Sequence, residues 1–221
     1  MSEQARKMTG CKMLHYATVT STAGAITFGV PKKIPHIEEY NYTFLYAEAS
    51  NYADNQQNIY KKKITGADLG LVLSELKGAV EAELMGKTHA KGGTVTNTND
   101  QQIAVAILWE ETYSDGTAVR NVFYNCKLSK DEVSGKTEGE SLEFTADKLV
   151  GKAIPLSNGD IHYKLDNSEA DYDSTKFNDW FTKVQTIATE EAQTAKVVAR
   201  TAKAKKAKVA KVEEATEEKG E

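Results

Sequence analysis

The sequence of 221 residues has few of the residues that stabilise secreted or membrane proteins. Its only cysteines, Cys11 and Cys126, are too few for a disulfide framework and fall in strand-like segments, so we expect small buried or half-buried hydrophobic residues. No stretch approaches the ~20 apolar residues of a membrane span. The first residues, MSEQARKMTG, lack the apolar core of a signal peptide. These absences predict a protein that is made in the cytoplasm and does not contact a membrane.

Catalytic and metal-binding patterns are also missing. The four histidines, His15, His36, His89 and His162, are far apart, and none has a second histidine at ligand spacing. Two Gly-Lys-Thr triplets lack the upstream glycine of a phosphate loop, and no Gly-x-Ser-x-Gly motif occurs. Carboxylates are plentiful, but no spacing singles out an acid/base pair. We therefore expect a protein that is not an enzyme and has no cofactor or metal.

Charge and composition are those of an acidic globular protein. There are 32 Asp and Glu residues against 28 Lys and Arg residues, which gives a net charge of −4, and 40% of the residues are hydrophobic. A net negative charge disfavours general binding to nucleic acid. The length suits one domain, residues 1–188, followed by a tail, residues 189–221.

The tail differs sharply in composition from the domain. Lys196–Lys211 contains seven basic residues and no acidic ones, whereas Glu213–Glu221 contains five acidic residues and one lysine. The tail lacks the large apolar residues needed to offset chain entropy, so we expect disorder or transient helix. We interpret its basic block as a solvated extension, with a contact to DNA or an acidic partner as the alternative.

The segment that organises the domain is a long β-hairpin. Ile103–Trp109 is a nearly unbroken apolar run, and Ala118–Leu128 is rich in Val, Phe and Tyr. Between them, in the turn Ser114–Thr117, Asp115-Gly116 supplies the pair of positive-φ residues that a two-residue hairpin turn requires. A run that is apolar on both faces predicts a central strand between two layers.

Further strands and two helices are expected around this hairpin. Ser174–Ile187 has apolar residues at helical spacing, and Glu75–Met85 forms a second helix that starts after Ser74 as N-cap and stops at Gly86. The remaining strands are predicted at Cys11–Thr20, Ala25–Val30, Asp68–Leu73, Ser141–Asp147, Lys152–Leu156 and Ile161–Leu165.

The segment from Ile37 to Thr65 combines aromatic and basic residues. A strand over Ile37–Glu48 places Tyr40, Tyr42, Phe44 and Tyr46 on one face. A polar segment with turn-forming residues, Ala49–Asn58, follows, and a strand over Ile59–Thr65 carries Lys61, Lys62 and Lys63. Aromatic residues in register anchor either a sheet or an interface.

Two motifs in this chain resemble those of a known family. Thr137, Gly139, Glu140, Ser141, Leu142, Glu143 and Phe144 form a T-x-G-E-S-L-E-F pattern, with Gly151 after it, and Tyr52-Ala53-Asp54-Asn55 forms a YADN signature. Together with the order LWEETYSDGTAVRNVFYNCKLSKDE, these motifs are similar to those of the major tail protein of long, non-contractile phage tails. The resemblance covers about residues 10–188.

The resemblance implies a fold and an assembly. The expected fold is mainly β, a β-sandwich or partial barrel with one flanking helix, a C-terminal helix and a disordered tail. Six subunits would close into a ring whose strands form a continuous inner barrel, and stacked rings would make a DNA-conducting tube in the virion, assembled in the bacterial host cytoplasm. The implied partners are other copies of the chain, tape-measure, tail-terminator and distal tail proteins, and DNA passing without sequence-specific binding.

Two sets of candidate site residues follow from this family reading. The element that contacts the next ring is expected within Tyr40–Thr65, through Tyr40, Tyr42, Tyr46, Tyr52, Asp54, Asn55, Lys61, Lys62 and Lys63. A DNA conduit should repel phosphate, so acidic side chains should outnumber basic ones on its inner surface. The candidates for that surface are Glu39, Glu143 and Asp147.

Two other classes of function remain open at this point. One is the tube protein of a contractile tail or of a type VI secretion-like machine, which would have the same fold but belong to a different assembly. The other is a non-viral β-sandwich binding module that shares common turns. A tube protein should polymerise or form rings, whereas a binding module should stay small.

Overall fold

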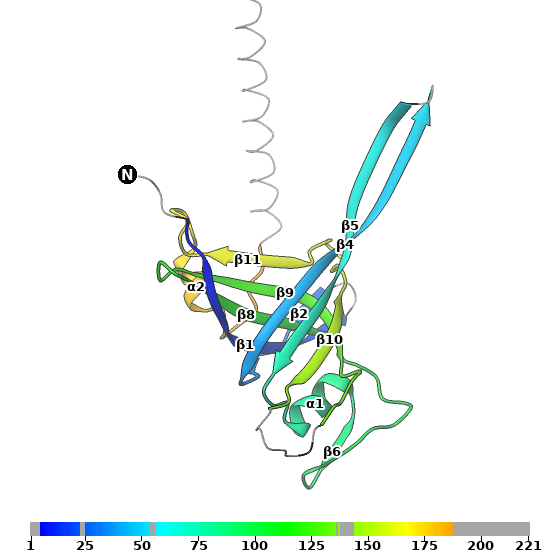
Figure 1. Cartoon of the computed structure of the whole chain (residues 1–221), viewed down its shortest axis with the longest axis vertical. Coiled ribbons are helices and arrows are strands. Elements are labelled where there is room, and N and C mark those ends of the chain that lie inside the picture. Colours follow the sequence, from blue (N-terminus) through cyan, green and yellow to red (C-terminus); the bar gives the residue numbers. More distant parts are fainter. Residues whose placement is uncertain (1–4, 23–24, 54–55, 136, 138–143, 188–221) are drawn as a thin grey trace, which may run out of the picture. The chain divides into compact units, whose positions relative to one another are not determined.

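The computed structural model describes residues 5–22, 25–53, 56–135, 137 and 144–187 (Figure 1). The chain divides into two compact units, Met1–Gln185 and Thr186–Glu221, and all the elements described below belong to the first. The expected disordered tail, residues 189–221, lies outside the described residues.

The described part of the chain is mainly β-structure, as predicted. The strands are β1 (Met8–Thr22), β2 (Ala25–Phe28), β3 (Lys32–Lys33), β4 (Ile37–Ala53), β5 (Gln56–Leu73), β6 (Thr88–Ala90), β7 (Gly93–Val95), β8 (Val105–Tyr113), β9 (Ala118–Ser129), β10 (Asp147–Ala153) and β11 (His162–Asp166). The helices are α1 (Gly78–Met85) and α2 (Ser174–Asn178).

One antiparallel sheet makes both layers of the fold. Its strand order is β2-β1-β8-β9-β10-β5-β4, with β11 paired to β9 and β3 paired to β1, while β6 and β7 form a separate hairpin. Strand β9 pairs with β11 along Val119–Phe123 and with β10 along Cys126–Ser129. Strand β9 therefore belongs to both layers, one with β2, β1, β8 and β11 and one with β10, β5 and β4.

The two layers face each other across an aromatic and aliphatic core. Tyr40 of β4 packs on Trp109 of β8 with ring centroids 5.1 Å apart, and Tyr42 packs edge-on against Phe123 of β9 at 5.3 Å. Leucines of β5, including Leu71, are buried in the same core. These contacts confirm the predicted sandwich.

A second core covers the other face of β8. Leu108 of β8 and Val122 of β9 pack there with Trp180, and all three are fully buried. Residues of β8 therefore alternate between two cores, and residues 105–111 are buried throughout. The prediction of a central strand between layers is confirmed, because a strand with no solvent-facing side must be apolar on both faces.

The turns that local chemistry specified form where they were expected. Between β8 and β9, Gly116 has φ +83° and its N–H donates to the carbonyl of Tyr113 at 3.1 Å. The predicted two-residue turn with a positive-φ pair is wrong in detail, because only Gly116 has a positive φ and the Tyr113 N–H donates to the carbonyl of Thr117 at 3.0 Å, which closes a loop of three residues. The strands predicted at Cys11–Thr20 and Ala25–Val30 are also present, and they form a hairpin in which β1 pairs with β2 from Val19 opposite Phe28.

Helix α1 is shorter than predicted at its N-terminus. It begins at Gly78 after Lys77, which makes no side-chain cap, and not after Ser74. The reason is tertiary, because the carboxylate of Asp147 accepts the backbone N–H of Leu76 at 2.8 Å. The predicted stop is confirmed, since Gly86 has φ +69° and closes the helix.

Helix α2 is also much shorter than the predicted Ser174–Ile187. It spans Ser174–Asn178, with Asp173 as N-cap. Trp180 leaves the helical path to donate its indole N–H to the carbonyl of Asn121 at 3.3 Å. The carbonyl of Gln185, further along, accepts the buried Tyr124 hydroxyl at 2.9 Å. These contacts with β9 compete with the helical hydrogen bonds of this segment.

The strand predicted at Ser141–Asp147 is wrong where the structure describes it. Residues 144–146 are not in a strand, and β10 begins at Asp147 and continues through Gly151. Phe144, an apolar residue of the predicted strand, is 98% exposed. Pairing explains the change, because the facing strand β5 ends at Leu73, opposite Asp147.

The polar segment predicted as a loop, Ala49–Asn58, instead continues both strands of the β4–β5 hairpin. β4 runs to Ala53 and β5 starts at Gln56, with Ser50 opposite Tyr60. Asp68–Leu73, predicted as a separate strand, is the end of the same β5. Cross-strand pairs keep the ribbon extended where the polar composition alone indicates a loop.

Candidate assembly surface

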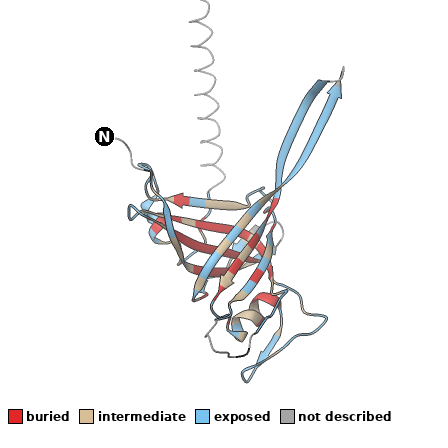
Figure 2. Ribbon diagram, in the orientation of Figure 1, coloured by how far each residue is buried: buried red, intermediate tan, exposed pale blue. Residues whose placement is uncertain are grey.

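The outer half of the β4–β5 hairpin, Tyr46–Ala53 with Gln56–Ile64, is exposed along its length and is here called the arm. β10 pairs with β5 only from Ala67 to Leu73, so within the described residues the two strands of the arm pair only with each other. Figure 2 shows the arm exposed along its length, whereas the sheet at its base is largely buried.

The arm leaves the sheet at a defined point. The register between β4 and β5 shifts at Leu45/Tyr46, which marks a β-bulge that bends and twists the ribbon there. Gly66 lies just inside the bulge, where a Cβ would come 2.8 Å from the carbonyl oxygen of Ala153. A larger residue would force β5 away from the end of β10, so glycine permits the close approach.

One face of the arm is aromatic with an internal ion pair. Glu48 and Lys62 lie opposite each other and form a 2.6 Å salt bridge, and the Lys62 ammonium lies 4.3 Å from the centre of the Tyr46 ring. The hydrogen bond between Glu48 and Lys62 lowers the pKa of Glu48 and raises that of Lys62. Ile64 lies opposite Tyr46 on this face, and Tyr60 lies one pair further toward the tip than Lys62.

The other face of the arm is basic. Lys61 and Lys63 lie opposite Ala49 and Ala47, whose small side chains leave the lysines unobstructed. Among the described residues neither lysine is paired with a carboxylate. Ile59 completes this face, opposite Asn51.

Large apolar and aromatic side chains of the arm are open to solvent. The exposed fractions are 46% for Tyr46, 67% for Tyr52, 46% for Ile59, 54% for Tyr60 and 41% for Ile64. A two-stranded ribbon is marginally stable alone, and large apolar side chains that are exposed on both of its faces indicate an interaction site.

The structure separates the residues predicted to contact the next ring. Lys61, Lys62 and Lys63 lie on the arm with Tyr46 and Tyr52. Asp54 and Asn55 lie outside the described residues.

Tyr40 and Tyr42 belong to the base and face the core. The Tyr40 hydroxyl donates to the carboxylate of Glu111 at 2.7 Å, and burial followed by this hydrogen bond raises the pKa of Tyr40. Tyr42 also contacts His162, with ring centroids 5.6 Å apart. These two tyrosines anchor the hairpin that carries the arm.

Sequence reasoning did not single out Ile59, Tyr60 and Ile64 as interface residues. Their signal was the alternation along β5, which places Tyr60 and Ile64 on the face of Lys62. That signal could be used only once the ribbon was known to continue beyond the core, because in a buried strand the same residues would be packing residues.

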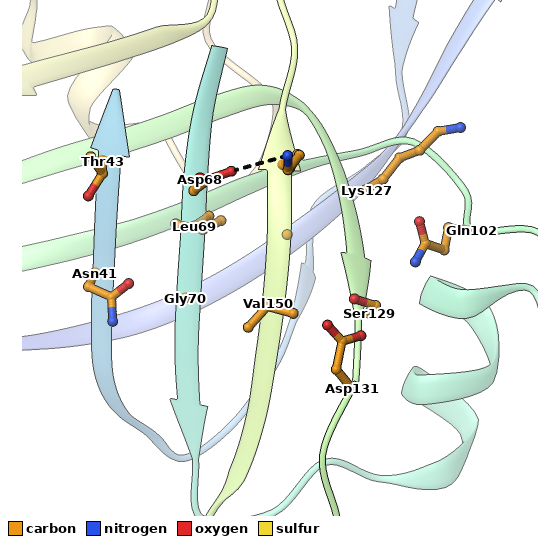
Figure 3. A pocket seen from close by; sticks show the side chains of 12 residues that line it. Asn41, Thr43, Asp68, Leu69, Gly70, Gln102, Lys127, Ser129, Asp131 and Val150 are labelled. Carbon is orange, nitrogen blue, oxygen red and sulfur yellow. Dashed lines mark ion pairs between the residues drawn. The ribbon is translucent and has the colours of Figure 1, made fainter. Parts of the chain in front are cut away.

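A second exposed surface is the outer face of the layer that contains β4, β5 and β10. A shallow groove lies on it, lined by Asn41, Thr43, Asp68, Leu69, Gly70, Gln102, Lys127, Ser129, Asp131, Val150, Gly151 and Lys152 (Figure 3). Gly70 leaves room for the side chain of Asn41, whose amide oxygen would be 2.6 Å from a Cβ at that position. The groove therefore offers amide and hydroxyl groups between oppositely charged residues.

The three residues predicted for the inner surface of a tube have different positions. Glu39 is exposed and alternates with Tyr40, so it lies on the same outer face as Asn41. Glu143 lies outside the described residues. Asp147 does not share the polar strand face on which it was predicted. It lies on the β10 face of Leu149 and forms a 2.6 Å salt bridge with Lys130.

The buried charged groups are satisfied inside the sandwich. Glu110 pairs with Arg120 at 2.6 Å and with Lys12 at 3.2 Å, and Glu111 accepts from Tyr40 and from the amide of Asn121 at 2.9 Å. Hydrogen-bonded partners allow such groups to be buried.

Metal-binding clusters and membrane-spanning helices are not found in the described ranges. No group of three or more His, Cys, Asp or Glu side chains there is placed to hold a metal ion. No helix in that part of the chain is long and apolar enough to cross a membrane. Both cysteines are free, with Cys126 buried and Cys11 half-buried, as predicted.

No protein-family model matches this chain, and no curated protein matches it. Its function must therefore be inferred from its surfaces and from the resemblance of its motifs.

Proposed function

We propose that this protein is a structural subunit that assembles with copies of itself into stacked rings, forming the DNA-conducting tube of a long, non-contractile phage tail. In this assembly the arm reaches the neighbouring ring, and the sandwich forms the wall. The tape-measure, tail-terminator and distal tail proteins implied by the sequence resemblance would be its further partners.

The observation that carries the proposal is the arm. Tyr46, Tyr52, Ile59, Tyr60 and Ile64 stay between 41% and 67% exposed on a ribbon supported on neither edge. Such a ribbon is an aggregation hazard in a monomer and becomes useful when a defined partner covers it. The YADN signature begins with Tyr52 and Ala53, the last residues of β4, and its other two residues lie outside the described part of the chain.

Ring closure has suitable strand edges. In the described sheet β2 and β4 are the terminal strands, and β11 pairs on one edge only, with β9. Pairing such edges between neighbours removes an aggregation hazard by making it the interface. Repetition of that contact by a fixed rotation closes a ring.

The outer face of β4, β5 and β10 is the surface that we assign to the lining of the tube. It carries Glu39 and the groove residues, whose charged members are Asp68, Asp131, Lys127 and Lys152; Lys148 also alternates onto this face (Figure 3). Acidic and basic residues on the described part of this face are equal in number. The expected acidic excess is absent from these residues, so the proposed lining would present a neutral polar surface to DNA.

The test is assembly of the purified full-length chain, observed by negative-stain electron microscopy and light scattering. The matched variant replaces residues 49–61 with Asn-Gly, so that a two-residue turn joins the paired Glu48 and Lys62. The unaltered protein should form rings and stacks, and the shortened variant should form no stacks. Because the removed residues make no contact with the core, its free energy of unfolding should stay within about 1 kcal/mol.

Two results would contradict the proposal. Unaltered protein that remains monomeric at high concentration, together with its absence from particles of its native source, would refute the tube role. Stacks of normal length from a folded, shortened variant would refute the role of the arm.

A further inference from the structure

The arm and one other surface lie at opposite ends of the same strand. β5 runs from Gln56 in the arm to Leu73, where it pairs with Asp147, the first residue of β10. Strand β9 ends nearby, because Ser129 pairs with Val150, which pairs with Gly70 of β5. The chain after β9 and the chain before β10 therefore both leave the sheet at the end of β5 away from the arm.

That far end carries exposed apolar and acidic residues. Val133 is 79% exposed and Phe144 is 98% exposed, and Asp131 and Glu132 are exposed beside them in the sequence. The ends of this segment are held together by the 2.6 Å salt bridge between Lys130 and Asp147. We use the name far-end surface for the exposed residues that flank these two strand ends, Asp131, Glu132 and Val133 after β9 and Phe144 before β10.

The arm is complementary to this surface in charge and in apolar character. Its basic face presents Lys61 and Lys63 without a carboxylate partner among the described residues, and Ile59 lies on the same face. Tyr52 adds an exposed aromatic ring near the tip. The far-end surface offers two carboxylates and two apolar side chains. The arm and the far-end surface of one chain cannot contact each other, because they lie at opposite ends of β5.

We infer that the far-end surface of one copy receives the arm of the next copy, in a head-to-tail contact. This inference rests on the proposed stacked assembly and names its receiving surface. A contact between two different surfaces of the same chain forms a closed ring only when each copy is rotated relative to the last by a suitable angle. When the copies are related mainly by translation along β5, the same contact produces an open stack. Opposite charges on the two surfaces fix the direction of stacking, because two arms or two far ends would repel.

The length of β5 also predicts the axial repeat of the stack. Twelve residues separate Lys61 from Leu73, which at about 3.3 Å per residue corresponds to roughly 40 Å along β5. The axial repeat of the stack should therefore be about 40 Å, and less if β5 is inclined to the stack axis.

The test uses two charge-reversed variants of the full-length chain. One carries Lys61→Glu and Lys63→Glu, and the other carries Asp131→Lys and Glu132→Lys. Each should raise the protein concentration needed for stacking by at least about tenfold. A mixture of the two should stack again with the variants alternating. The acidic arm of the first variant then meets the basic far-end surface of the second, and the unaltered basic arm of the second meets the unaltered acidic far-end surface of the first.

Two further variants separate this contact from general effects. Phe144→Ser removes an apolar side chain that is 98% exposed, so it should weaken stacking without changing the free energy of unfolding. Lys7→Glu with Lys33→Glu makes the same change of charge at exposed lysines away from the arm and should leave stacking unchanged.

The outcomes distinguish this inference from the proposed function. If the unaltered protein stacks and both reversed variants stack equally well, or if their mixture fails to recover, the far-end surface is not the receiving surface and the tube role stands. If the unaltered protein does not stack under any condition, both proposals fail.

Discussion

A half-buried histidine at the base of the arm, His162, should make the stability of the sandwich depend on pH. His162 of β11 packs on Phe123 with ring centroids 4.5 Å apart and contacts Tyr42 and Phe44 of β4. Its Nε2 lies 3.2 Å from the amide oxygen of Asn121. Burial, with a smaller contribution from the charge of Lys164, lowers the pKa of His162 from 6.5 to about 4.

The direction and the size of the change in stability with pH follow from this pKa. The unfolded chain binds the proton first, so the native state loses stability as the pH falls from 6.5 toward 4 and keeps it fully above 6.5. Each unit of pKa difference corresponds to about 1.4 kcal/mol, so the full effect is about 3 kcal/mol. Most of it, about 2 to 3 kcal/mol, should be lost between pH 7 and pH 4.5.

Urea denaturation followed by tryptophan fluorescence at several pH values between 7 and 4.5 measures this effect. His162→Phe keeps a ring in the aromatic cluster and removes the titrating group, so its free energy of unfolding should vary much less over this range. His89→Gln, at an exposed histidine of β6, should behave as the unaltered protein does. A His162→Phe protein with the original pH dependence would refute the assignment.

Two matched pairs of substitutions give further predictions for urea denaturation. Gly86→Ala should lower the free energy of unfolding by more than about 2 kcal/mol, because φ is +69° and a Cβ would clash with the backbone oxygen of Gln101. Gly92→Ala, at φ +80° with open space around it, should lower it by about 1 kcal/mol. Equal losses would contradict the steric argument. Tyr40→Phe should cost about 1 to 2 kcal/mol because the buried Glu111 loses a donor, whereas Tyr46→Phe on the arm should change stability by less than about 0.5 kcal/mol. An unchanged free energy of unfolding for Tyr40→Phe would show that water replaces the lost hydroxyl as the donor to Glu111.

Much of the fold could be predicted from local sequence. The Asp115-Gly116 pair specified the β8–β9 turn, and the apolar run before it specified a strand buried on both faces. Gly86 marked the end of α1. These signals are local, because a turn residue or a residue periodicity acts through the backbone conformation of a few neighbours.

The candidate site could be predicted only in part. The sequence placed Tyr40, Tyr42 and Tyr46 on one strand face, but it could not tell which of them the second layer covers. The register of β4 against β5, and the end of β10 at Ala153, decide that Tyr42 packs on the core while Tyr46 lies beyond it. Burial depends on how far the neighbouring strands extend, which residue alternation does not encode.

By itself, the sequence determined the β-rich class, the central hairpin and the clustering of lysines and tyrosines before β5 ends, because each depends on residues close together in the chain. Only the tertiary structure decided that Trp180 interrupts the second helix, that Asp147 accepts the backbone N–H of Leu76 before α1, and that Tyr46–Ala53 and Gln56–Ile64 extend beyond the sheet as an exposed arm. Those outcomes depend on contacts between segments far apart in the sequence, where competing hydrogen bonds and neighbouring strands determine which local preference is realised.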